Sequence, residues 1–303
     1  MKLSTWVRPL ALLAWLLPGG ACAAGVAATD DVGARVSLPA PARRIVSLAP
    51  SATEIVYAAG AGAALVGVVS SSDFPPAARS VTRVGDAHGL DLERIVALAP
   101  DLIVTWPYTV PAQLARLRER GIAIFMVDPR DVDGIAGAVA QVGVLAGTRP
   151  VADAAARDLR ARYAGLTAHY RDRPSIAVFY EVWGAPVVTL GGTHLVTRAL
   201  EACGGRNVFA DADGPAPNVG VEAVLVARPE VIIAGVAGAV RPAWLDDWRR
   251  WPMLPAVAYG NLLAVNADWL HRPGPRFVDG VAELCRTLDE ARRRRGQHGA
   301  GQP

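Results

Sequence analysis

Short apolar runs alternate along the chain with longer amphipathic stretches. The runs RIVSL, LVGVV, DLIVTW and AIFMV are rich in Val and Ile, which is typical of buried strands. Between them, LERIVALA, PAQLARLRER and VDGIAGAVAQVGVLAG have the spacing of helices, and Pro111 suits the first turn of the second. The segment from Ser51 to Glu54 predicts a helix that opens with a capping box. Strands that alternate with helices indicate a mainly parallel sheet covered on both faces.

A long polar stretch separates this half from a second one of the same kind. The sequence VADAAARDLRARYAGLTAHY is rich in Ala and Arg, which predicts one long, stiff helix. Beyond it, SIAVFYEVW, VIIAG and LLAVN read as strands, and HLVTRALEA, VEAVLVA and RFVDGVAELCRTLDEARRRR as helices. We therefore expect an α/β protein of two lobes, each a mainly parallel sheet flanked by helices, joined by one long connecting helix.

The expected boundaries follow from these patterns. They are a signal peptide at 1–23, a leader at 24–42, an N-terminal α/β lobe at 43–147, the connecting helix at 148–171, a C-terminal α/β lobe at 172–292 and a polar tail at 293–303.

One segment occurs in each lobe. Residues 92–104 recur as residues 221–233, and in both copies a glutamate, Glu93 or Glu222, stands seven positions before a proline. Each copy predicts a short helix that ends at the proline and leads into a buried strand. Chance similarity between two generic helix-turn-strand units is the alternative. The helix dipole alone accounts for a glutamate in a first turn. Two matched acids on two lobes would also suit two arginines on a two-fold symmetric partner.

The N-terminus has the features of a cleavable export signal. Lys2 and Arg8 precede the apolar run from Leu10 to Leu17, and small residues follow. The run is shorter than the roughly 20 residues that cross a bilayer. We expect cleavage after Ala23; lipid attachment at Cys22 is the alternative, although Gly19 matches such a site poorly.

Composition excludes several functions. The net charge of +3 loses two positive charges with Lys2 and Arg8, so we expect no nucleic-acid partner. Lys2 is the only lysine, so the exported chain has none for a phosphate-binding loop, a Schiff base or a Ser-Lys dyad. Neither G-x-S-x-G nor H-E-x-x-H occurs. We therefore expect that the protein is not an enzyme. An exported hydrolase or metalloenzyme is the alternative from a different functional class.

Two cysteines remain in the exported chain, Cys203 and Cys285. In an oxidising compartment they predict a disulfide, with two free buried thiols as the alternative.

Aromatic residues follow most of the predicted strands. They are Phe74, Trp106, Tyr108, Trp183 and Trp269. Ligands of α/β sheets gather beyond the carboxyl ends of strands, so flat rings from two lobes would suit a large, rigid, partly apolar ligand. Each ring alone is as well explained as a core or loop anchor. Asp268 and Arg272 follow the last strand and would either hydrogen-bond a ligand or pair with each other.

Several of these motifs together resemble a known family. RIVSLAPSATEIVYAAG, SSDFPP, GLDLERIVALAPDLIVTW, LEACGGRNVF and NADWLHRPGPR look like the periplasmic cobalamin-binding proteins of ABC importers, in the helical-backbone (class III) group of substrate-binding proteins. The similarity covers about residues 43–288, and SDFPP, LERIVAL and the DW...R..PR ending are specific when taken together.

The resemblance implies a function and roles for named residues. It implies a monomer without cofactor that binds a corrinoid through Phe74, Trp106, Asp268 and Arg272, with Trp183 nearby. It also implies that Glu93 and Glu222 dock onto arginines of the importer's membrane subunits, and that Cys203 and Cys285 form a disulfide.

Two departures from the family pattern concern the ligand. Phe74 replaces a tyrosine, and Ala87 replaces a tryptophan just before His88. An imidazole at the cleft rim can coordinate cobalt or haem iron, although an exposed loop histidine without a ligand is the simpler interpretation. A haem- or ferric-siderophore-binding protein of the same architecture is therefore the alternative function, with Tyr108 and His88 as its ligands.

Overall fold

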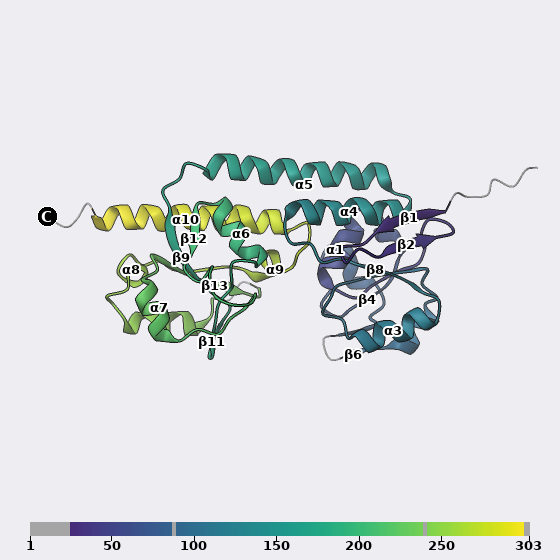
Figure 1. Cartoon of the computed structure of the whole chain (residues 1–303), viewed down its shortest axis with the longest axis horizontal. Coiled ribbons are helices and arrows are strands. Elements are labelled where there is room, and N and C mark those ends of the chain that lie inside the picture. Colours follow the sequence, from purple (N-terminus) through teal and green to yellow (C-terminus); the bar gives the residue numbers. More distant parts are fainter. Residues whose placement is uncertain (1–24, 87–88, 239–240, 300–303) are drawn as a thin grey trace, which may run out of the picture.

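The computed structural model describes residues 25–86, 89–238 and 241–299. Two α/β lobes lie next to each other beneath one long helix (Figure 1). Within those described ranges, no helix has both the length and the apolar character that a bilayer crossing requires. The expected signal peptide, Cys22 and His88 lie outside the described residues.

The N-terminal lobe contains a four-stranded parallel sheet. Its strands are, in order across the sheet, β4 (Leu65–Val68), β3 (Ile45–Ser47), β7 (Leu102–Thr105) and β8 (Ala123–Met126). Side chains alternate between its two faces, as a strand requires. Ile45 and Phe125 pack in the core beneath α1 (Pro50–Ala58) and α4 (Val132–Ala146). Val46 and Ile103 pack against α2 (Leu92–Ala97) and α3 (Pro111–Glu119).

The C-terminal lobe repeats this architecture. Its parallel strands are, in order, β12 (Gly205–Asn207), β9 (Ile176–Glu181), β13 (Val231–Val236) and β14 (Leu262–Asn266). One face is covered by α6 (Leu195–Ala202) and α10 (Phe277–Gly299). The other face is covered by α7 (Val221–Ala227), α8 (Pro255–Ala258) and the 3₁₀ helix Ala243–Arg250. Helix α9 (Ala267–Leu270) follows β14.

Short elements complete the two lobes. They are the 3₁₀ helices Gly62–Ala64 and Pro76–Ser80 and the two-residue strands β5 (Gly85–Asp86), β6 (Gly89–Leu90), β10 (Trp183–Gly184) and β11 (Val187–Val188).

Helix α5 (Arg149–Tyr170) connects the lobes and packs along α4, α6 and α10 (Figure 1). Arg160 pairs with Asp133 of α4 at 2.8 Å, and Arg162 pairs with Asp279 of α10, so α5 makes an ion pair with a helix of each lobe. The predicted α/β fold of two lobes and one long connecting helix is confirmed.

The two ends of the described chain differ from the simple leader and tail expected. Residues of the leader form an antiparallel hairpin of β1 (Val26–Thr29) and β2 (Arg35–Leu38), which packs on α4 and β8. The Asp30 carboxylate closes its turn by accepting hydrogen bonds from the backbone of Val32 and Ala34. At the other end α10 continues to Gly299, and Arg295 donates to the carbonyl of Ser175 at 3.0 Å.

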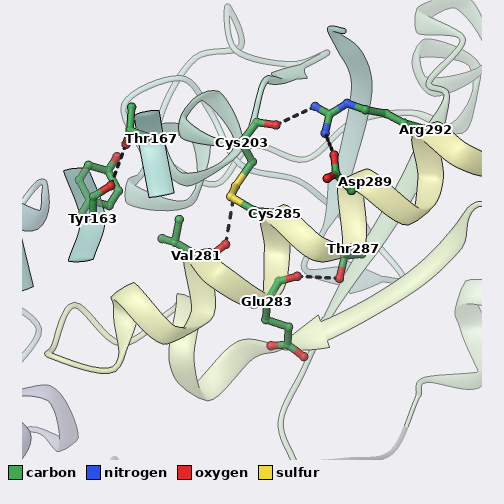
Figure 2. The surroundings of a disulfide bond; sticks show 9 residues. All are labelled: Tyr163, Thr167, Cys203, Val281, Glu283, Cys285, Thr287, Asp289 and Arg292. Carbon is green, nitrogen blue, oxygen red and sulfur yellow. Dashed lines mark hydrogen bonds and ion pairs between the residues drawn. A yellow bond between two sulfur atoms is a disulfide. The ribbon is translucent and has the colours of Figure 1, made fainter. Parts of the chain in front are cut away.

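The predicted disulfide between Cys203 and Cys285 is confirmed (Figure 2). It joins the end of α6 to the middle of α10, and both cysteines are fully buried. Beside it, Arg292 donates to the Cys203 carbonyl at 2.7 Å and pairs with Asp289 at 2.8 Å. Covalent and polar contacts therefore hold α10 against the end of α6 at the same place.

Candidate functional site

The predicted ligand residues in the described chain all come after strands of the two parallel sheets. Trp106 and Tyr108 follow β7, Phe74 follows β4, and Trp183 follows β9. Asp268 and Arg272 lie on or just after α9, behind β14. Parallel strands end at a common edge, so each sheet presents its side chains at its carboxyl edge.

Trp106 and Tyr108 line two cavities. One, of about 330 Å³, lies in the N-terminal lobe and is also lined by Leu48, Val69 and Val110. The other, of about 100 Å³, lies between the lobes, where the same two rings face residues of the C-terminal lobe. The two rings meet edge to face with centroids 5.2 Å apart, and Tyr108 is 77% exposed. This aromatic pair therefore offers apolar surface to a ligand between the lobes.

Asp73, Asp268 and Arg272 form an ion-pair network that connects the lobes. Arg272 places one nitrogen 2.7 Å from Asp268 and another 2.7 Å from Asp73 of the N-terminal lobe. The mutual pair considered for Asp268 and Arg272 is thus present, together with a third partner that the sequence did not suggest. Phe74, next to Asp73, is 39% exposed. These residues do not line the two cavities described above.

Trp183 stands apart from both groups. It begins the β10–β11 hairpin, is 60% exposed and lines neither of the two cavities. Its ring nitrogen donates to the carbonyl of Ala185 at 2.9 Å, which holds the indole on its own hairpin. In this arrangement the structure does not bring Trp183 to the Trp106–Tyr108 pair.

Glu54 and Arg276 form a second ion pair between the lobes, which is more buried than the first and was not predicted from the sequence. The predicted capping box is wrong: α1 begins at Pro50 after Ala49, no side chain caps it, and the buried Ser51 hydroxyl makes no hydrogen bond. Glu54 instead receives two hydrogen bonds from Arg276, at 2.6 and 3.0 Å. Burial raises the pKa of the Glu54 carboxyl, and Arg276 opposes that rise. Arg276 belongs to the PGPR segment quoted above, but its local sequence indicates no partner.

A cluster of two histidines and a tyrosine in the C-terminal lobe was also missed. The Tyr180 hydroxyl and His271 Nε2 are 2.9 Å apart, and the His194 and His271 rings lie 6.5 Å apart. Burial, with a contribution from His271, lowers the pKa of His194 to about 4, and burial also lowers the pKa of His271. Both imidazoles are therefore neutral at pH 7 and face the Trp106–Tyr108 pair across the inter-lobe cavity. Only the absence of a side chain at Gly235 leaves room for Tyr180 and His271.

Glu93 and Glu222 lie in the first turns of α2 and α7 and line neither of the two cavities described above. Both are exposed, and the nine-residue segments 92–100 and 221–229 show the same sequence of buried, half-buried and exposed positions. Each lobe thus presents one carboxylate on an equivalent helix.

Comparisons with known proteins identify the family. Residues 45–268 match the periplasmic binding protein family. A vitamin B12-binding protein of Vibrio cholerae is 39% identical over 257 residues, which is 84% of this chain and 92% of that protein. Another, of Photorhabdus laumondii, is 35% identical over 255 residues, 84% of this chain and 90% of that protein.

Solved structures agree with this assignment. The crystal structure of the periplasmic vitamin B12 binding protein BtuF of Vibrio cholerae superimposes with a TM-score of 0.75 and 38% identity, over 83% of this chain and 98% of that one. The periplasmic heme-binding protein RhuT of Roseiflexus gives a TM-score of 0.72 at 26% identity, over 82% and 98%. The relatives named here are binding proteins rather than enzymes. This chain belongs to the periplasmic binding protein family and is most similar, among these relatives, to the vitamin B12-binding proteins.

Proposed function

We propose that the protein captures cobalamin or a related corrinoid between its lobes in the periplasm and delivers it, chemically unchanged, to an ABC importer. One observation carries the proposal: Trp106 and the exposed ring of Tyr108 line both the cavity in the N-terminal lobe and the cavity between the lobes. The named relatives and the specific motifs at residues 72–76 and 266–276 support the same ligand class.

The chemistry of the ligand suits these side chains. A corrinoid has a broad, largely apolar ring with amide groups at its edge. Trp106 and Tyr108 would cover part of the ring, and Phe74 another part. Asp268 would accept hydrogen bonds from amide N–H groups, and Arg272 would donate to amide oxygens. A corrinoid is larger than either cavity, so it would lie across both, with the exposed Trp183 at its margin.

The importer is the second partner in the proposal. Glu93 and Glu222 are exposed, carry one negative charge each and occupy matched positions in the two lobes. They would engage one arginine on each of two membrane subunits while the protein remains a monomer. Because neither acid lines the two cavities at Trp106 and Tyr108, docking and ligand binding would use separate surfaces.

Calorimetric titration with cyanocobalamin tests the ligand. We expect sub-micromolar binding, weakened at least tenfold in the double variant Trp106→Ala and Tyr108→Ala. Tyr259→Ala is the matched control, since Tyr259 contacts His298 near the far end of α10. Heat indistinguishable from that of buffer with the unaltered protein would exclude cyanocobalamin as its ligand.

The exposed phenol of Tyr108 favours one alternative, haem or a ferric siderophore, because a phenolate binds ferric iron. A relative named as heme-binding shares the fold. Haemin should then give a new absorbance band that weakens in Tyr108→Phe or His88→Ala. Metal found in the purified protein without a corrinoid, haem or siderophore would instead indicate a metalloenzyme.

A further inference from the structure

The contact between Glu54 and Arg276 has features that a surface ion pair lacks. Glu54 is 3% exposed, and the Arg276 side chain is 15% exposed. Two guanidinium nitrogens reach the two carboxylate oxygens, Nη2 to Oε1 at 2.6 Å and Nε to Oε2 at 3.0 Å. This fork geometry fixes the direction of both side chains as well as their separation. A small rotation of one lobe would break two charge-assisted hydrogen bonds together.

The surrounding backbone reinforces the contact. Gly274 lies against the first turns of α1: a Cβ at this position would be 3.5 Å from both the Ser51 carbonyl oxygen and a Glu54 carboxylate oxygen. The segment between α9 and α10 therefore rests directly on the N-terminal lobe. The Arg272–Asp73 bridge links the same segment to the N-terminal lobe at a second, more exposed point, because the Asp73 side chain is 51% exposed.

Arg276 also contacts a residue of the proposed ligand site. Its guanidinium carbon lies 4.1 Å from the centroid of the Phe74 ring. A cation held over an aromatic face orients that ring. Arg276 of the C-terminal lobe therefore contacts both a buried carboxylate and an aromatic ring of the N-terminal lobe.

We infer that Arg276 is a positioning residue of the ligand site: through Glu54 it holds the lobes at a set spacing before any ligand enters, and it holds the Phe74 ring in place for contact. The second part rests on the proposed function, whereas the first concerns the ligand-free protein alone. Glu54 and Arg276 thereby join the residues that determine the shape of the cleft.

Pulsed electron paramagnetic resonance measures the lobe spacing directly. Spin labels at Ala115→Cys on α3 and Val226→Cys on α7 report from exposed positions of the two lobes, with Cys22 replaced by Ser. Without ligand, the otherwise unaltered protein should give one narrow distance distribution. Arg276→Gln should broaden it or add a second population, and cyanocobalamin affinity should fall at least tenfold.

Companion variants separate the contributions. Arg276→Lys keeps the charge but cannot make the two-point contact, so its distance distribution and its affinity should lie between those of the unaltered protein and Arg276→Gln. If Arg276→Gln fails to fold, Arg276→Lys provides the test. Phe74→Leu should lower affinity and leave the distances unchanged. The matched control Arg162→Gln removes the exposed pair with Asp279 and should change neither quantity.

The results discriminate between explanations. Identical ligand-free distances in Arg276→Gln, Arg276→Lys and the reference protein would overturn the inference, even if affinity fell, because Arg276 would then act on the ligand alone. If the reference protein binds no cyanocobalamin, the proposed ligand fails, while the ligand-free distances still decide the role of the pair.

Discussion

Ala99 and Arg228 adopt the same left-handed backbone conformation, with φ of 41° and 48°, and each immediately precedes a proline that leads into an inner strand of its lobe. They are the non-glycine residues with positive φ in the part of the chain that the structure describes. The repeat seen in the sequence therefore extends to the backbone of the two lobes. The turn lets a helix end against a proline, before which the right-handed helical conformation is disfavoured.

This conformation predicts a stabilising substitution. A left-handed backbone costs an L-residue about 1 kcal/mol, and glycine avoids that strain. Ala99→Gly should therefore raise the free energy of unfolding by about 0.5 kcal/mol, since the greater freedom of glycine in the unfolded chain offsets part of the gain. Urea denaturation measures the change. Ala97→Gly, two residues earlier in α2, is the control and should destabilise by about 0.5–1 kcal/mol; a loss at both positions would contradict the strain argument.

The proposed docking role of Glu93 and Glu222 predicts that their loss affects uptake and leaves ligand binding unchanged. In cells that depend on this protein, replacing both Glu93 and Glu222 by Ala should reduce corrinoid uptake at least tenfold. Affinity in solution should stay within about twofold, because neither residue lines a cavity of the cleft. Glu201→Ala, which removes an exposed glutamate of α6, should affect neither measurement. Lost affinity in the double variant would assign the acids to the fold or the site instead.

The disulfide predicts a large effect of reduction. Loop closure over the sequence separation of 82 residues stabilises the folded chain by about 4.5 kcal/mol when the unfolded chain is cross-linked. Denaturation with and without a reductant strong enough to open the buried bond should show a loss of several kcal/mol. The double variant Cys203→Ala and Cys285→Ala should be reduced in stability to a similar extent and should no longer respond to the reductant.

Glu181 predicts a pH-dependent effect. This carboxyl is 1% exposed and accepts a hydrogen bond from the Trp248 indole at 2.8 Å, and burial raises its pKa to about 7. The folded chain keeps the proton to a higher pH than the unfolded chain, whose pKa is near 4.5. The stability that this group contributes is therefore complete below pH 4.5 and is lost as pH rises through 7.

The variant Glu181→Gln stays neutral at every pH. Relative to the unaltered protein, its free energy of unfolding should rise by about 2–3 kcal/mol between pH 4.5 and pH 8, at about 1.4 kcal/mol for each unit of pKa shift. Urea denaturation at several pH values measures this difference. A difference that is the same at pH 5 and pH 8 would show that the carboxyl titrates alike in both states.

The fold could be predicted from the sequence because the periodicities of helices and strands are local features. Runs such as DLIVTW and the long Ala- and Arg-rich segment predicted β7 and α5 directly. The disulfide was predictable because an oxidising compartment leaves two cysteines few alternatives. The placement of Trp106 and Tyr108 beside a cavity followed from their position after a parallel strand.

Contacts between the lobes could not be predicted from the sequence, for a physical reason. Glu54 and Arg276 are 222 positions apart, so neither residue's neighbours identify the other. The local pattern instead suggested a capping box, but Glu54 pairs with the distant guanidinium of Arg276, which compensates its buried charge. Trp183 was assigned from its place after a strand, but its indole is hydrogen-bonded within its own hairpin and lines neither cavity.

The helical layer of α4, α5 and α10 lets the two lobes share one apolar cluster, while the opposite face of each sheet packs in a separate cluster. Buried residues from both sheets, including Ile45 and Val231, belong to a single contiguous cluster that passes beneath α5. Neither lobe can then be exposed to water without disturbing packing that the other needs. Heating should consequently produce one cooperative calorimetric transition, so that a partly melted protein with one intact lobe does not accumulate.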